Sequence, residues 1–180
     1  ILTFDLNDKA GNQGIWAVSP DGERKPRLLI DLPVSVQKHS VFSPDGKWMA
    51  YMSSETGQIQ VFVQPFPTTG AKYQISTRGG RAPHWSPDGK QLFYNQGDQL
   101  IAVDIHTTPA FGFGSPVPLP IEGTIHPVSA RNYDITPDGK RFVVILPASA
   151  SSTQPASKNA PQINVVVHWF EDLKQRVPVH

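Results

Sequence analysis

Short apolar stretches separated by turn-forming residues run along the whole chain. The stretches are four to six residues long, and most contain β-branched or aromatic side chains, which is typical of strands rather than helices. The pattern predicts an all-β protein. The expected strands are 2–6, 14–18, 27–30, 39–42, 48–52, 60–63, 73–76, 82–85, 91–94, 100–104, 132–135, 141–146 and 163–167.

Several of these strands are apolar at consecutive positions, as in 100–103, 142–146 and 165–167. A strand with one face in water alternates instead, so consecutive apolar positions indicate burial on both faces. A β-propeller provides this burial, because each of its blades lies between two others. A two-sheet sandwich would leave one face of each sheet wet. We therefore predict a β-propeller of four-stranded antiparallel blades.

One turn sequence recurs along the chain. It reads Ser-Pro-Asp-Gly-Lys at 43–47 and 86–90, Thr-Pro-Asp-Gly-Lys at 136–140, and Ser-Pro-Asp-Gly at 19–22. Proline presets the backbone for a type I turn, and glycine supplies a left-handed residue without steric cost. The Ser or Thr hydroxyl can hydrogen-bond forward to the amides of the turn. Catalytic or metal-binding roles for Asp45, Asp88 and Asp138 are the alternative, but turn chemistry already explains these residues, which we interpret as hairpin corners.

The copies of this turn divide the chain into about four blades. Ser43 and Ser86 are 43 positions apart, and Ser86 and Thr136 are 50 positions apart. The copy at Ser19 is out of step, because it follows a second strand where the others follow a first strand. We expect a single propeller segment over 1–180, which is a partial or half propeller. The expected bounds are 1–33 for an incomplete blade, 34–78, 79–121 and 122–170 for the other blades, and 171–180 for a C-terminal tail.

Composition narrows the possible partners. The 180 residues include 18 Pro, 14 Gly and no Cys, a profile that suits short strands joined by tight turns. A net charge of +1 with 17% charged residues gives no basic surface for nucleic acid. Without cysteine there is no disulfide, Cys-ligated zinc or thiol nucleophile. No apolar run approaches the ~20 residues of a membrane span, so we expect no membrane insertion.

The repeated unit, an aromatic or apolar residue followed by this turn and a strand, resembles the TolB-like propeller repeat, also called the PD40 or WD40-like repeat. The match is specific at 42–51, 85–94 and 135–142. Segments 60–67 and 164–173 also resemble the C-terminal propeller region of large bacterial proteins with an upstream serine/threonine kinase or winged-helix domain. The resemblance implies a non-catalytic module for sensing or protein–protein interaction, with a protein or peptide partner. We also expect a location in the bacterial cell envelope or periplasm.

Propellers of that family carry about six to eight blades, which is more than this chain holds. We therefore expect either a fragment of a longer chain or a half-propeller that forms a homo-oligomer through its exposed blade faces. The alternative function is an accessory or gating propeller of a peptidase or esterase, with catalysis supplied elsewhere. A third possibility is hydrolysis at a site formed between chains.

Motifs of known chemistry are missing from the sequence. It has no nucleophile elbow, phosphate loop or dinucleotide glycine pattern, and the six histidines show no metal-ligand spacing. We expect no catalytic residue, cofactor or metal, and a metal site assembled from separate blades is the alternative. The tail at 169–177 has helix-compatible apolar spacing and is predicted to cap the last blade, with a docking peptide as the alternative.

The first strands of the blades supply the candidate site. The residues directly before the turns, Phe42, Trp85 and Ile135, are interpreted as core between blades. Side chains alternate along a strand, so the polar residues beside them point elsewhere. Inner strands border the central channel of a propeller, and we expect an interaction site at the channel mouth. The plainer interpretation is a set of solvated polar residues at that mouth. The candidate residues are His39, Arg81, His84, Arg131 and Asp134.

Overall fold

The computed structural model describes residues 1–7, 13–21, 24–31, 36–121, 133–146 and 162–167. Within these ranges the chain forms fifteen strands and every pairing is antiparallel. The strands are β1 (Leu2–Asn7), β2 (Gln13–Val18), β3 (Arg27–Ile30), β4 (Gln37–Phe42), β5 (Trp48–Ser53), β6 (Gln60–Pro65), β7 (Tyr73–Gln74), β8 (Arg81–Trp85), β9 (Gln91–Gln96), β10 (Gln99–His106), β11 (Gly112–Phe113), β12 (Val117–Pro118), β13 (Tyr133–Ile135), β14 (Arg141–Leu146) and β15 (Gln162–Val167).

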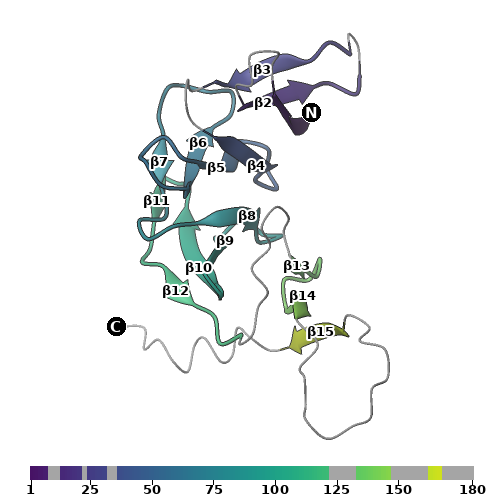
Figure 1. The fold of residues 1–180 in the computed structure, drawn as a ribbon, viewed down its shortest axis with the longest axis vertical. Helices are drawn as coiled ribbons and strands as arrows, with labels where there is room; N and C mark the ends of the chain where they lie inside the picture. The colour runs from purple at the N-terminus through teal and green to yellow at the C-terminus, as the bar shows by residue number, and fades with distance from the viewer. Residues whose placement is uncertain (8–12, 22–23, 32–35, 122–132, 147–161, 168–180) are drawn as a thin grey trace, which may run out of the picture.

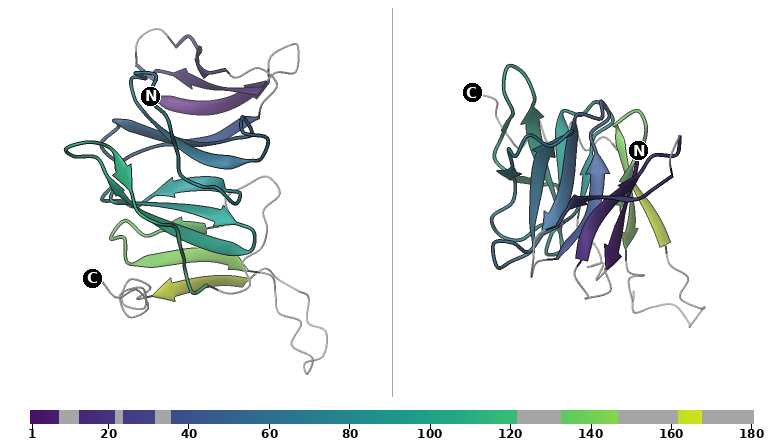
Figure 2. Two further views of the ribbon diagram at one scale, coloured as in Figure 1. Left: turned by 90° about the vertical axis from the view of Figure 1, so that its left-hand side faces the viewer. Right: turned by 90° about the horizontal axis from the view of Figure 1, so that it is seen from above.

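The strands form four sheets, in which neighbours in sequence pair with each other except that β12 pairs with β10. Sheet A contains β1 to β3, sheet B β4 to β7, sheet C β8 to β12, and sheet D β13 to β15. The sheets follow one another along an arc, with β4, β8 and β13 on its concave side and β7, β11 and β12 on its convex side (Figure 1). Two further views show the sheets stacked face to face (Figure 2). Such stacking is that of propeller blades, which confirms the predicted fold class.

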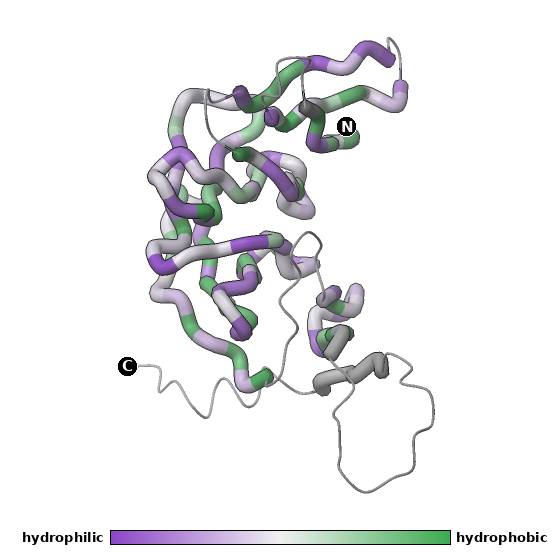
Figure 3. The backbone as a smooth tube through the Cα atoms, in the orientation of Figure 1, coloured by the Kyte–Doolittle hydropathy of each residue, from purple (hydrophilic) through white to green (hydrophobic). Residues whose placement is uncertain are grey.

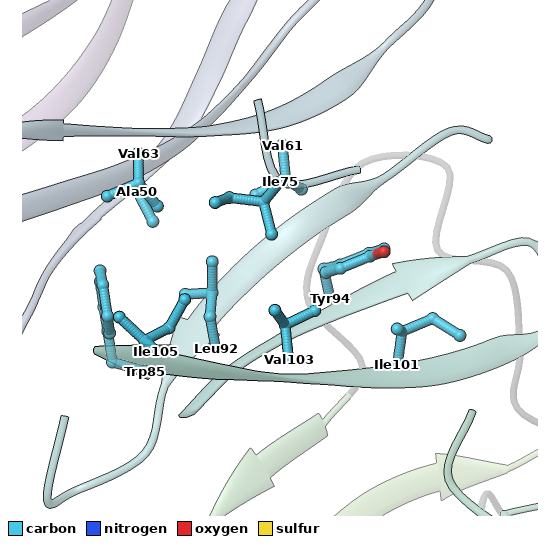
Figure 4. Close-up of a cluster of buried hydrophobic side chains, with 10 residues drawn as sticks. All are labelled: Ala50, Val61, Val63, Ile75, Trp85, Leu92, Tyr94, Ile101, Val103 and Ile105. Carbon is cyan, nitrogen blue, oxygen red and sulfur yellow. The ribbon is translucent and has the colours of Figure 1, made fainter. Parts of the chain in front are cut away.

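Apolar side chains fill the space between adjacent sheets. Between sheets B and C, residues such as Val61 and Ile75 project toward Leu92 and Val103 (Figure 4). Two smaller clusters lie between sheets A and B and between sheets C and D. The hydrophobic positions recur from strand to strand around the arc (Figure 3). Residues 100–103 are buried at four consecutive positions, as the sequence predicted for a strand covered on both faces.

The three residues expected in the core between blades occupy that place. Trp85 is 4% exposed and belongs to the cluster between sheets B and C. Phe42 packs against the cluster between sheets A and B, and Ile135 against the one between sheets C and D. The prediction for these positions is confirmed, because each is the last residue of an inner strand and faces the neighbouring sheet.

The recurring turn has the same hydrogen bonds in its copies after β4, β8 and β13. In the first of these, the Ser43 hydroxyl donates to Asp45 Oδ1 at 2.6 Å and accepts from the Trp48 amide at 3.0 Å. Asp45 Oδ1 also accepts from the Lys47 amide at 3.0 Å. The glycine at the fourth position has φ between 68° and 71° in all three copies, as predicted for a left-handed residue. The aspartates therefore hold their own turns.

These turns also touch one another along the arc. A Cβ on Gly89 would lie 3.5 Å from Pro44 of the preceding turn, and a Cβ on Gly139 would lie 3.7 Å from Pro87. The proline of each turn therefore sits beside the glycine of the next. The copy at Ser19 has a different place in its sheet, because it lies between the last two strands of sheet A rather than the first two.

The outer strands are shorter than the sequence pattern suggested. The fourth strand of sheet B ends at Gln74, although the amides of Ile75 and Ser76 both donate to the Val61 carbonyl. In sheet C two short strands, β11 and β12, pair with the long β10, in keeping with the proline-rich sequence there. The predicted surface loop at 147–161 and the predicted capping tail at 169–177 lie outside the described residues.

The turn aspartates make stability sensitive to acid. The pKa of Asp45 lies below its usual range because the Ser43 hydroxyl donates to the carboxylate. Burial raises the pKa of Asp88, but hydrogen bonds from Ser86 and the Lys90 amide outweigh it, so the net direction is also downward. A carboxyl with a lowered folded pKa contributes stability above about pH 4, and that stability is lost as the pH falls through the folded value.

Asp88→Asn is expected to lower the unfolding free energy at pH 7 by about 0.5–1 kcal/mol, a modest value because the carboxylate is exposed. The difference from the unsubstituted chain should shrink below about pH 4, where the native carboxylate also becomes protonated. Urea unfolding across this pH range measures both effects. Asp31→Asn, at an exposed aspartate outside the motif, is the control. An equal loss in both variants, or a loss at Asp88 that persists in acid, would contradict the role of the turn.

Candidate interaction site on the inner face

The concave side of the arc contains a hollow of about 470 Å³. We call this concave side the inner face. Strands β1, β4, β8 and β13 all contribute to the hollow, through residues that include Leu2, Val41, His84 and Ile135. Most of this lining is apolar, and His84 is a polar group placed among apolar neighbours. The channel-mouth site expected from the sequence stays a prediction.

Two inner strands are bulged at the same place relative to their turns. The pairing of β4 with β5 shifts between Lys38 and Val41, and the pairing of β8 with β9 shifts between Arg81 and His84. Each bulge contains a residue with left-handed backbone, His39 at φ 55° and Ala82 at φ 50°. Both precede the Ser of their turn by four positions. A bulge leaves backbone groups without their ladder partners, so these groups need partners elsewhere.

Side chains of the adjacent sheet bond the groups at the bulges. The His39 amide donates to Asp5 Oδ2 at 3.2 Å, from β4 to β1. The Tyr133 hydroxyl donates to the Ala82 carbonyl at 2.8 Å, from β13 to β8. A backbone group at each bulge is thereby joined to the sheet beside it.

Two further hydrogen bonds follow the same plan. Thr3 Oγ1 donates to the Ser40 carbonyl at 3.4 Å, and Trp85 Nε1 donates to the Val41 carbonyl at 3.3 Å. In the second case, the side chain of β8 reaches the carbonyl at the end of the bulge in β4. The walls of the hollow are therefore joined across sheets by directional bonds as well as by apolar packing.

The side chains of His84 and Asp134 meet across two blades. Nε2 of His84 lies 3.2 Å from Oδ1 of Asp134, and the pair is accessible, with side chains 21% and 61% exposed. The His84 ring meets the Tyr133 ring edge-on, with centroids 6.2 Å apart. Asp134 Oδ1 also accepts from the Ile135 amide at 2.9 Å, which fixes the carboxylate beside the histidine. The structure thus brings together two of the five residues that the sequence singled out.

The other three predicted residues are placed differently. His39 lies in the β4 bulge, and its amide, not its ring, makes the contact with Asp5. Arg81 begins β8 and is exposed. Arg131 lies outside the described residues. Of the described members of the set, His84 alone lines the hollow.

A second hollow, of about 540 Å³, lies between the turns of sheets B and C. Its lining includes Asp45, Asp88, Asp104 and His106, which invites a metal or ligand interpretation. Asp45 and Asp88 already hold their turns, and Asp104 accepts from Gln91 Nε2 at 2.8 Å. Among the described residues, no cluster of three or more potential ligands could hold a metal ion. The carboxylates here are therefore explained by the fold.

Sequence reasoning missed the residues that join the sheets at the inner face. Asp5, Thr3 and Tyr133 were assigned only to strands, and the bulges were not anticipated. His39 and Ala82 interrupt no strand pattern in the sequence, so their left-handed backbone was not predicted. In the described part of the chain, no helix has the length and apolar character to cross a membrane.

Several solved structures share this architecture. A protein assigned as TolB from Agrobacterium tumefaciens aligns with a TM-score of 0.66 at 16% identity, covering 93% of this chain and 57% of that chain. A chain of the nidogen/laminin complex gives 0.59 at 12% identity, covering 92% and 56%. Oligogalacturonate lyase from Vibrio parahaemolyticus gives 0.58 at 14% identity, covering 93% and 45%. No protein-family model and no curated protein sequence matches the chain.

These likenesses establish the fold as that of a β-propeller. The chain spans about half the length of the proteins it matches, in keeping with a partial propeller. They include an enzyme and a member of a protein complex, so the fold alone does not select a function. The predicted association with a kinase or winged-helix domain stays a prediction.

Tyr133→Phe tests the bonds at the bulges. The substitution removes the donor to the Ala82 carbonyl within a buried contact, and we expect a loss of about 1 kcal/mol in unfolding free energy. Tyr94→Phe is the matched control, because Tyr94 is fully buried and its hydroxyl has no hydrogen-bond partner. Burial raises the pKa of Tyr94 to about 12, so this hydroxyl is neutral at pH 7.

Urea unfolding of both variants measures the difference. Removing an unpaired buried hydroxyl should leave stability unchanged or raise it. A loss of the same size in both variants would mean that the Tyr133 hydroxyl contributes nothing specific to the joint between sheets C and D.

Proposed function

We propose that this chain is a non-catalytic protein-interaction module that binds a peptide segment of a partner protein in the inner-face hollow. The observation that carries the proposal is the His84–Asp134 pair, two accessible polar side chains in contact beside an apolar hollow of about 470 Å³. Protein-binding surfaces commonly combine an apolar depression with a few fixed polar groups. The module would act in sensing or recognition within a bacterial multidomain protein.

The pair is suited to recognition because it is fixed in position and still reachable. Asp134 is held by the Ile135 amide, and His84 is held against the Tyr133 ring, so little side-chain entropy is lost when a partner binds. Apolar residues such as Leu2 and Val41 offer contact area next to these polar groups. A peptide that places an apolar side chain in the hollow could hydrogen-bond to the pair at its rim.

The other functions considered from the sequence stay predictions. An accessory role beside a hydrolase is compatible with the fold, since a lyase shares it, but no contact among the described residues favours that role. Self-association through exposed blade faces and a location in the cell envelope or periplasm are likewise predictions. Binding at the inner face is a more specific proposal than these predictions, because named residues define the site.

Selection from a random peptide library against the full chain tests the site. Peptides that bind the chain should lose at least about tenfold in affinity, or about 1.4 kcal/mol, when His84 and Asp134 are both replaced by Ala. The melting temperature should change little, because the pair is exposed at the rim. Calorimetry on the purified variants measures affinity and stability separately.

The matched control replaces a different pair of contacting side chains. Lys72 and Glu55 pair near the outer strand of sheet B, and their double Ala variant should bind the selected peptides unchanged. If the selected peptides bind equally well to the His84→Ala/Asp134→Ala variant, the inner face is not the recognition surface. A loss of binding in both double variants would likewise argue against a specific site.

A further inference from the structure

One wall of the second hollow, of about 540 Å³, is an extension of sheet C. Strand β6 of sheet B ends at Pro65, which pairs with Trp48. The equivalent pair in sheet C is Asp104 and Gln91, because Trp48 and Gln91 each directly follow the lysine of their turn. Strand β10 continues beyond Asp104 and pairs with β11. Residues 105–108 of this extension line the hollow.

The same extension brings an aromatic side chain to sheet B. The ring centroid of Phe111, in the loop between β10 and β11, lies 4.4 Å from that of Trp48 and 4.3 Å from that of Tyr73. Trp48 is half-buried and lines the hollow. Because its neighbours pack against it, the ring of Trp48 forms a fixed part of the wall.

The propeller fold does not require an aromatic residue at the position of Trp48. Gln91 and Arg141 hold the equivalent positions in sheets C and D, directly after the lysine of the turn. The equivalent groove between the turns of sheets C and D is smaller, at about 320 Å³. Its lining includes Asp88 and Asp138, and among the described residues no aromatic side chain contributes to it. The aromatic wall is therefore particular to the groove between sheets B and C.

The polar groups around this hollow include hydrogen-bond acceptors and donors. The fold uses only one oxygen of each turn carboxylate, because Asp45 and Asp88 hold their turns through Oδ1. The second oxygen of each exposed carboxylate is left for another partner. Lys90 and Thr108 are exposed and line the same hollow. A ligand in the hollow would therefore meet carboxylates, an ammonium group and a hydroxyl together.

This combination favours an uncharged ligand that is rich in hydroxyl groups. An anion would face the carboxylates, and a cation would face the ammonium group of Lys90. A hydroxyl both donates and accepts hydrogen bonds, so it matches Asp45 and Lys90 alike. A sugar ring carries several hydroxyls, and its C–H groups suit the negative face of an aromatic ring. The volume lies within the range of about 300–1,000 Å³ that is usual for small-molecule pockets.

We propose that the second hollow binds a sugar unit of a neutral oligosaccharide, which stacks on the ring of Trp48. Its hydroxyls would donate to Asp45 and Asp88 and accept from Lys90. The inference goes beyond the proposed function, because the second hollow shares no lining residue with the inner-face hollow.

Titration of the full chain with neutral trisaccharides, observed by proton–nitrogen correlation NMR, tests this inference. The probes are maltotriose, cellotriose, mannotriose and xylotriose. At least one should bind with a dissociation constant in the millimolar range or below and shift the indole N–H signal of Trp48. The signal of Trp16, a half-buried residue of β2, is the internal control and should stay unchanged. The affinity should be the same at low and high salt, since the ligand carries no charge.

Trp48→Ala should weaken the binding at least about tenfold, because it removes the stacking surface. Trp16→Ala is the matched control and should bind the trisaccharide with unchanged affinity. The His84→Ala/Asp134→Ala variant should also bind it unchanged, which separates failure of this inference from failure of the proposed function. If Trp48→Ala does not fold, the two indole signals of the unsubstituted chain decide the question.

Three results would overturn the inference. The first is that no trisaccharide shifts the Trp48 signal at about 10 mM. The second is an equal shift of the Trp16 and Trp48 signals, and the third is unchanged affinity in a folded Trp48→Ala variant. Arginine amide is the comparison probe for a cation. If it shifts the Trp48 signal and the trisaccharides do not, the hollow is a cation site and the inference is wrong.

Discussion

The joints between blades depend on the bulges in the inner strands. Apolar packing between sheets is strong but non-directional, so it does not by itself fix how one blade sits on the next. The bulges in β4 and β8 turn backbone groups away from their own ladders, and side chains from neighbouring blades bond them. Left-handed backbone at His39 and Ala82 is costly for non-glycine residues. The bonds and packing around these residues offset that cost.

The recurring turns also contribute to the arrangement of the blades. A Ser or Thr hydroxyl and an Asp carboxylate close each hairpin, and the proline of one turn lies beside the glycine of the next. One short sequence thus sets both the shape of a blade and its spacing from its neighbour. The carboxylates of Asp45 and Asp88 are engaged within their turns, whereas the His84–Asp134 pair is accessible at the inner face.

Much of the fold could be predicted from the sequence because burial and turn chemistry are local signals. Consecutive apolar positions predicted that β10 is buried on both faces. The place of Trp85 directly before its turn predicted that it belongs to the core between blades. The site was harder to predict. His84 and Asp134 each lie two residues before the first residue of a turn, which the sequence shows, but the contacts of Tyr133 with His84 and Ala82 arise only from the packing of blades. Bulges depend on long-range contacts, so a strand pattern does not reveal them.

The contact between Trp85 and the β4 bulge tests this account most directly. The indole N–H of Trp85 donates to the Val41 carbonyl across the B–C joint. Proton NMR of the full chain is predicted to show slow exchange of this N–H and a nuclear Overhauser effect between it and Val41. Rapid exchange with no such effect, in a chain whose strands are otherwise protected, would mean that the bulged inner strands do not join the blades.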